Sequence, residues 1–162
     1  MPANEVSSGG SESFAQLRDR LEAESGDSLK LLAHPDDNPI CSVSLDSQLP
    51  AVIVTWKRYA TSTQLRFIHE YVLDLLRQRK LIKLLEDQTS LATIHSEDQD
   101  WIAKDWMPRA VAAGLHAIAA KSPTSYFGNL SVSHIHARAP KSLAIRAFTD
   151  LDDCRQWLGA AQ

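Results

Sequence analysis

The sequence predicts an α/β fold with a mixed β-sheet, and three observations lead to this prediction. Apolar runs of strand length alternate with segments of helical period along most of the chain. Two early runs are separated only by the five turn-forming residues 46–50, which is typical of an antiparallel hairpin. Later runs are each followed by a helical segment, and such crossovers join parallel strands in a right-handed sense. We therefore expect an initial antiparallel hairpin, parallel strands after it, and helices packed chiefly on one face.

Length and composition set the expected domain organisation. The chain has 162 residues, of which 44% are hydrophobic and 23% charged, as in one ordinary globular domain. Residues 1–13 are rich in Ser, Gly and Glu and are expected to form a disordered leader. Apolar residues recur at helical spacing over 14–25, which predicts a possible N-terminal helix that either docks or floats. Residues 28–160 remain for the single α/β domain.

Six apolar runs have the length of strands. CSVSL (41–45) alternates in character with period two, and the turn-forming run PDDNP (35–39) precedes it. AVIVTW (51–56) is apolar on both faces, as in a strand buried inside a sheet. The predicted strands, in chain order, are 29–34, 41–45, 51–56, 81–86, 115–120 and 143–148.

Capping signals mark the starts of two long helices. Thr61 and Gln64 have the spacing of a capping box, in which a hydroxyl and an amide satisfy two unpaired backbone donors. The helix that follows is expected to end near Lys80. Ser96 and Gln99 have the same spacing, so Ser96 is expected to be the N-cap of the second helix.

The second helix is expected to run to about Ala113 and to be irregular. Gly114 is well placed to cap its C-terminus. Pro108 lies inside it and removes the hydrogen bond to the carbonyl of Lys104, so we expect a kink or two helical pieces. The other predicted helices are a weaker one over 126–139 and a short last one capped by Thr149-Asp150.

Composition argues against several classes of function. The net charge is −3 and the pI is near 6.0, so nothing favours nucleic acid. No apolar run approaches the ~20 residues of a membrane span, and the polar N-terminus lacks the apolar stretch that a signal peptide needs, so we expect neither. Cys41 and Cys154 are far apart in the sequence, so we expect them to be free buried thiols of a cytoplasmic protein. No nucleophile-elbow or phosphate-binding glycine motif is present, so we expect no enzyme and no cofactor.

Three segments carry a resemblance to a known family: VIVTWKRYATSTQLR, LLEDQTSLATIHSEDQDWIAKDWMPRAVAAGL and FTDLDDCRQWL. Together they resemble a group of small bacterial proteins of uncertain function that look like STAS domains, the fold of anti-sigma-factor antagonists. The similarity covers about residues 28–158. It implies a mixed sheet with helices chiefly on one face and a regulatory role through protein contact, without implying an activity.

The resemblance also points to Ser96. In true antagonists a serine at the start of the helix after a central strand is phosphorylated, and Ser96 holds the corresponding position. This chain reads His-Ser-Glu-Asp there, and not the usual Asp-Ser-Ser-Gly. Glu97, Asp98 and Asp100 already supply negative charge, so a phosphate beside them would be repelled. We therefore expect Ser96 to serve as a helix cap.

Asp87 is the strongest candidate for a functional carboxylate. It ends a predicted central parallel strand, at the edge where α/β sheets place ligand sites, and the alternative is a loop-capping role.

Trp101 and Trp106, five residues apart, would lie about 140° from each other on a regular α-helix. Either both pack in the core, or one of them lines a groove or a contact between subunits. His134 and His136 would diverge on the predicted helix, so we expect no metal site.

Charge is distributed unevenly along the chain. Residues 57–83 carry an excess of Lys and Arg, and residues 86–105 carry an excess of Asp and Glu. Such asymmetry either steers a partner or reflects two solvated helix faces.

Two functions are compatible with these observations. The first is a non-catalytic regulatory module that binds a protein partner or forms a homodimer, through the helix 96–113 and the preceding loop 88–95. The second is the binding of a small apolar ligand, as in the CRAL-TRIO lipid-transfer domains of related α/β fold. Both rest on the expectation that no polar groups are spared for chemistry. Histidines and acids gathered around a hollow that reaches solvent would contradict that expectation.

Overall fold

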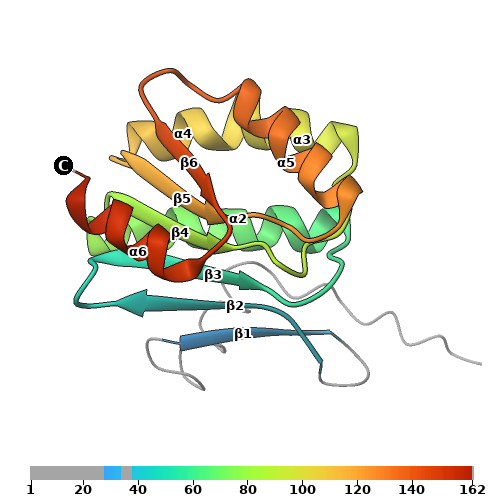
Figure 1. The fold of residues 1–162 in the computed structure, drawn as a ribbon, viewed down its shortest axis with the longest axis horizontal. Helices are drawn as coiled ribbons and strands as arrows, with labels where there is room; N and C mark the ends of the chain where they lie inside the picture. Colours follow the sequence, from blue (N-terminus) through green and yellow to red (C-terminus); the bar gives the residue numbers. More distant parts are fainter. Residues whose placement is uncertain (1–27, 34–37, 162) are drawn as a thin grey trace, which may run out of the picture.

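The computed structural model describes residues 28–33 and 38–161, with side chains from Ile40 onward (Figure 1). The expectations for residues 1–13 and 14–25 lie outside the described residues.

Six strands form one sheet whose spatial order follows the chain. The order is β1-β2-β3-β4-β5-β6; the pairs β1–β2 and β2–β3 are antiparallel, and the pairs from β3 to β6 are parallel. This confirms the predicted mixed α/β architecture. β2 begins inside the run 35–39 that was expected to be a turn. The strands are β1 (Ser28–Ala33), β2 (Asn38–Asp46), β3 (Ala51–Trp56), β4 (Lys83–Asp87), β5 (Ala117–Lys121) and β6 (Ala144–Phe148).

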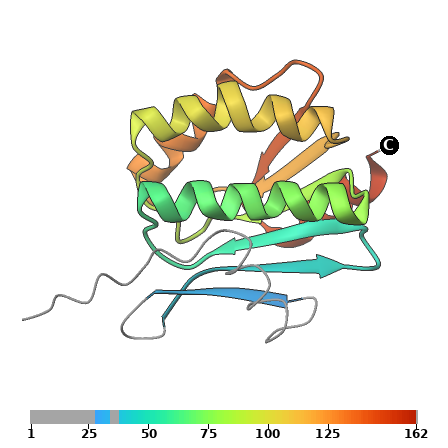
Figure 2. The same ribbon diagram turned by 180° about the vertical axis from the view of Figure 1, so that it is seen from behind.

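The helices cover the two faces of the sheet unequally. Because the parallel strands follow one another in space, right-handed crossovers place all the connecting helices on the same face. The last helix connects no strands and covers the opposite face (Figures 1 and 2). The helical segments are α2 (Ser62–Arg79), α3 (Ser96–Trp101), the π-helix η1 (Ile102–Trp106), α4 (Met107–Ala112), α5 (Tyr126–Ala137) and α6 (Leu151–Ala160).

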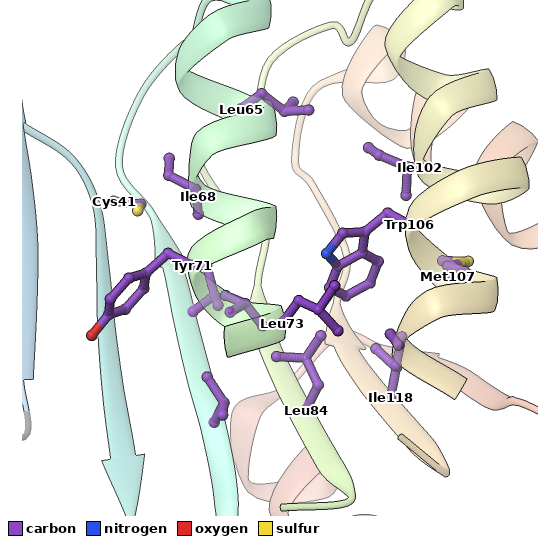
Figure 3. Packing of buried hydrophobic residues seen from close by; sticks show 14 of the residues in the cluster. Cys41, Leu65, Ile68, Tyr71, Leu73, Leu84, Ile102, Trp106, Met107 and Ile118 are labelled. Carbon is purple, nitrogen blue, oxygen red and sulfur yellow. The ribbon is translucent and has the colours of Figure 1, made fainter. Parts of the chain in front are cut away.

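The larger core lies between the sheet and the connecting helices. Trp106, 1% exposed, lies at its centre with its indole nitrogen turned toward α2 (Figure 3). Val132 and Ile135 bring α5 into the same core, and α5 packs chiefly on α3 and η1. A smaller core on the other face joins Cys154 and Leu158 of α6 to the sheet.

The capping box of α2 is confirmed. The Gln64 N–H donates to Oγ1 of Thr61, and the Thr61 N–H donates to Oε1 of Gln64 at 2.9 Å. The helix ends at Arg79, followed by Lys80 in the left-handed region with φ 52°. Arg77 and Arg79 lie in the last turn, where positive charge is favourable.

The predicted N-cap role of Ser96 is wrong. The N-cap is His95, which makes no side-chain capping bond, and Ser96 is the exposed first residue of α3. Two other hydrogen bonds form at this end of the helix, one of them with α5. Gln99 Nε2 donates to the carbonyl of Ile94 at 2.7 Å, and the Ile94 N–H donates to Ser131 Oγ at 3.1 Å. These buried bonds fix the backbone of Ile94, just before the helix, without the Ser96 hydroxyl.

The helix after His95 is divided as Pro108 predicts. The π-helical turn ends at Trp106, two residues before this proline, and the Met107 N–H donates to the carbonyl of Ile102, five residues back. The wider turn brings Trp101 and Trp106 toward the same side, where both rings contact His69. This π-helical turn departs from the regular α-helical spacing on which the expected separation of about 140° is based. Gly114, with φ 112°, ends the helix as predicted.

Candidate functional site

A cavity lies between the sheet and the helices α2, η1, α4 and α5. The space open to a water-sized sphere is about 30 Å³, room for about two water molecules. The whole hollow, including the part of its mouth that is open to solvent, has a volume of about 440 Å³. Three of its apolar lining residues, Ile102, Met107 and Ile118, are seen beside Trp106 in Figure 3. Its other lining residues are Trp56, His69, Glu86, Gln88, Leu91, Ile94, Trp106, Val132, Ile135 and His136.

His69 of α2 lies in an aromatic cage. Its ring centroid is 4.9 Å from that of Trp106, 5.9 Å from that of Trp56 and 6.0 Å from that of Trp101. Nδ1 lies 2.8 Å from the carbonyl of Leu65 and donates to it, because a carbonyl only accepts. Burial lowers the pKa of His69, while the charge of Glu86 opposes the shift. The imidazole is therefore neutral at pH 7, and Nε2 is a hydrogen-bond acceptor.

Trp56 ends β3 and carries an unpaired buried donor. Its side chain is 3% exposed, and its indole Nε1 has no partner in the described part of the chain. Trp106 differs, because its indole N–H donates to the backbone carbonyl of His69 at 2.6 Å. Buried indole N–H groups usually find such a partner.

Gln88 follows β4 and carries an unpaired buried acceptor. It is 5% exposed, and its Nε2 donates to Oε2 of Glu86 at 2.7 Å. Its Oε1 has no partner among the described residues. The strand register pairs Thr55 of β3 with Asp87 of β4. The next residues along the two strands, Trp56 and Gln88, therefore lie beside each other. The cavity is thus lined by a neighbouring donor and acceptor that find no partner among the described residues.

Glu86 adds a half-buried carboxylate to the same wall. Within the described ranges, no Lys or Arg forms an ion pair with it. Its charge acts to raise the pKa of His69 and His136 against the lowering effect of burial. Together with burial, the larger cause, it also raises the pKa of the Cys41 thiol to about 12. Cys41 is therefore protonated at neutral pH and is no nucleophile.

The structure separates the residues singled out in the sequence. Asp87 points to the other side of the strand from Glu86, and its Oδ1 accepts bonds from the Thr89 N–H at 3.0 Å and the Thr89 hydroxyl at 2.6 Å. These are the bonds of the loop-capping alternative. Ser96 is exposed at the start of α3.

The two tryptophans of α3 and η1 also differ in their surroundings. Trp106 belongs to the core and lines the cavity. Trp101 is half-buried, and the guanidinium carbons of Arg66 and Arg109 lie 5.1 and 5.9 Å from its ring centroid. His134 is exposed, whereas His136, two residues later on α5, is half-buried and reaches the cavity.

Charges of opposite sign meet between α2 and the helices beside it. Arg66 Nε donates to Oδ1 of Asp98 at 2.8 Å, and the Ser62 hydroxyl donates to the same oxygen at 2.6 Å. Arg109 pairs with Glu70 of α2 and with Asp105, the latter at 2.7 Å. Of these pairs, the one between Arg66 and Asp98 joins the basic segment 57–83 to the acidic segment 86–105.

Sequence reasoning missed the group formed by Trp56, His69, Glu86, Gln88 and His136. One signal was available: residues 86 and 88 alternate with Asp87 and so share the face on which β3 presents Trp56. The positions of His69 and His136 depend on how helices pack, which spacing along the chain does not reveal. The gathered histidines and acid contradict the expectation that no polar groups are spared around a hollow.

Among residues 28–33 and 38–161, no three His, Cys, Asp or Glu side chains converge closely enough to hold a metal ion. No described helix has the length and hydrophobicity needed to cross a membrane. Comparisons with protein-family models, curated proteins and solved structures found no match for this chain. The resemblance to STAS-like proteins stays a prediction.

Proposed function

We propose that this protein binds a small organic molecule in the cavity beside His69. One observation carries the proposal: in the described part of the chain, the buried N–H of Trp56 and the buried side-chain carbonyl of neighbouring Gln88 have no hydrogen-bond partner. Leaving such a group unpaired costs about 1–3 kcal/mol, and folded proteins pair nearly all of them. A ligand with one acceptor and one donor would satisfy both atoms at once.

The cavity favours a small polar ligand over a lipid. The hollow of about 440 Å³, of which about 30 Å³ is open to a water-sized sphere, suits a molecule of a few heavy atoms and is too small for a long acyl chain, even though most of the lining is apolar. Apolar walls with a few placed polar groups are typical of small-molecule sites. The ligand would enter by widening the mouth of the hollow or by displacing water from it.

A fragment screen read by NMR tests the proposal. In protein labelled with ¹⁵N, the indole N–H signals of Trp56 and Trp157 report on opposite faces of the sheet. We expect fragments with a donor and an acceptor to shift the Trp56 signal and to leave the Trp157 signal unchanged. Val132→Leu, which adds a methylene group to the cavity wall, should abolish the shift.

Val111→Leu makes the same change in α4, outside the cavity lining, and serves as the matched control. The proposal fails if no fragment shifts the Trp56 signal. It also fails if Val132→Leu binds the hits as well as the wild type does.

A weak contact between two copies of the chain is a second candidate function. Tyr126, Phe127 and Leu130 of α5 are 74%, 63% and 40% exposed, and the two aromatic rings lie edge to face at 5.3 Å. Aromatic side chains bury about 150–250 Å² each, so this patch falls short of the roughly 800 Å² per partner of a standard interface. Because this patch alone is too small for a standard interface, a regulatory role through protein contact would use the helix 96–113 together with α5.

Sedimentation equilibrium over a range of concentrations tests this second function. We expect the wild type to self-associate weakly and Phe127→Ser to remain monomeric. Ile82→Ser removes another exposed apolar side chain, 42% exposed, away from the patch. Self-association unchanged by Phe127→Ser would rule the patch out.

A further inference from the structure

We infer that the ligand is a small organic cation, an ammonium or amidinium group beside a hydrogen-bond acceptor, with Glu86 as its counter-ion. The inference rests on the proposed function, because it assumes that the cavity takes a ligand. It deepens that proposal by assigning the charge of the ligand.

The first argument is the balance of charge in the cavity. Glu86 places a half-buried carboxylate among mostly apolar walls, and within the described residues no cationic side chain pairs with it. A carboxylate in such surroundings requires a compensating charge or strong hydrogen bonds. The Gln88 amide supplies one bond, at 2.7 Å to Oε2, which leaves Oε1 available to a ligand.

The second argument is that the neighbouring histidines do not supply the missing charge. Burial lowers the pKa of His69 and of His136, so both rings are neutral at pH 7 despite the opposing effect of Glu86. Other charged groups that act on His69 are Glu70 and Asp98, and both are acidic. A bound cation would supply the charge that the histidines do not.

The third argument is the excess of acceptors over donors. Glu86 Oε1, Gln88 Oε1 and His69 Nε2 all accept hydrogen bonds, which suits the several N–H donors of an ammonium group. Trp56 Nε1 is the one unpaired buried donor of the described lining, so the ligand needs an acceptor beside its cation. Indole faces also attract cations, and two of the lining residues are tryptophans.

Isothermal titration calorimetry with a matched pair of probes tests the inference. Valinol carries an ammonium group, a hydroxyl group and a small branched apolar body, and 3-methylbutane-1,2-diol replaces the ammonium by a second hydroxyl. We expect the wild type to bind valinol at least tenfold more tightly than the diol. Glu86→Gln should weaken valinol binding at least tenfold and change diol binding less than twofold.

Asp87→Asn is the matched control, because it removes a neighbouring charge on the opposite side of the strand and keeps an acceptor for Thr89. It should leave the preference for valinol unchanged. Circular dichroism establishes that each variant is folded. Equal affinities for the two probes, or a preference that survives in Glu86→Gln, would overturn the inference and leave the proposed function standing. If neither probe binds and neither shifts the Trp56 indole signal, the cavity itself is rejected as the site.

Discussion

At the scale of single residues, His69 links the stability of the fold to the chemistry of the cavity. Its Nδ1 is held by the carbonyl of Leu65, one helical turn earlier, which fixes the tautomer and the ring position. The ring is surrounded by three tryptophans, so protonation would place a charge in the core. Its neutrality is therefore a condition both for folding and for the acceptor character of Nε2.

The titration of His69 makes stability depend on pH. The pKa of His69 is lowered in the folded state from its ordinary value of 6.5, so the unfolded chain binds the proton more tightly. Stability is then fully present above pH 6.5 and is lost as the pH falls. His69→Gln should reduce the slope of unfolding free energy against pH, between pH 6.5 and 5, by up to about 1.4 kcal/mol per pH unit.

Urea denaturation across this pH range measures the slope. His134→Gln replaces an exposed histidine of α5 and should retain the wild-type slope. A His69→Gln slope equal to that of the wild type would contradict the assignment of His69 as a buried neutral residue. The remaining slope is expected to include His136, whose pKa is also lowered by burial.

Gly128 controls the close approach of α5 to the loop beside the cavity. A Cβ atom at this position would lie 2.5 Å from the carbonyl oxygen of Leu91 and 2.6 Å from Oγ of Ser125. Gly128→Ala should therefore lower the unfolding free energy by about 1–3 kcal/mol, the usual cost of overpacking. Urea denaturation checks this, with Gly159→Ala as control, since a Cβ there meets only Leu49 Cδ1 at 3.9 Å. Equal stability of the two variants would refute the contact.

At the scale of elements, the π-helical turn determines which side chains face the cavity. Without its wider turn, α3 and α4 would be rotated relative to each other by about 100°, the angle of one residue in an α-helix. Trp101 and Trp106 could then not both contact His69.

Deletion of Lys104 removes the extra residue of this turn and tests its role. Lys104 is well exposed, so the loss of its side chain alone should change stability by less than about 0.5 kcal/mol in Lys104→Ala. The deletion should cost about 3–5 kcal/mol, because it turns one large aromatic side chain out of the core. Thermal unfolding of the two proteins separates the contributions. Similar midpoints would show that the turn is dispensable.

Most elements could be predicted from the sequence because their signals are local. The Thr61 capping box, the proline-divided helix and the hairpin 41–56 each depend on residues within one or two turns of one another. Ser96 shows where local signals fail. His95 is the N-cap instead, and the buried bond from the Ile94 N–H to Ser131 Oγ forms only when α5 packs against this loop.

At the scale of the whole molecule, the cavity follows from the topology. Because the parallel strands follow one another in space, the connecting helices α2, α3–η1–α4 and α5 lie on one face of the sheet. There α5 packs on α3 and η1. The cavity lies beneath α5 at the ends of β3 and β4. The buried side chains of Trp56 and Gln88 line it there. The candidate site could not be predicted because it joins four segments whose separation is set only by packing.

A crystal structure of the protein grown with valinol tests the central claim most directly. The account predicts one organic molecule in the cavity, with polar atoms within about 3.2 Å of Trp56 Nε1 and Gln88 Oε1. Its ammonium group should face Glu86. A cavity that holds only ordered water bonded to both atoms, at saturating probe, would contradict the claim that this fold is built around a ligand.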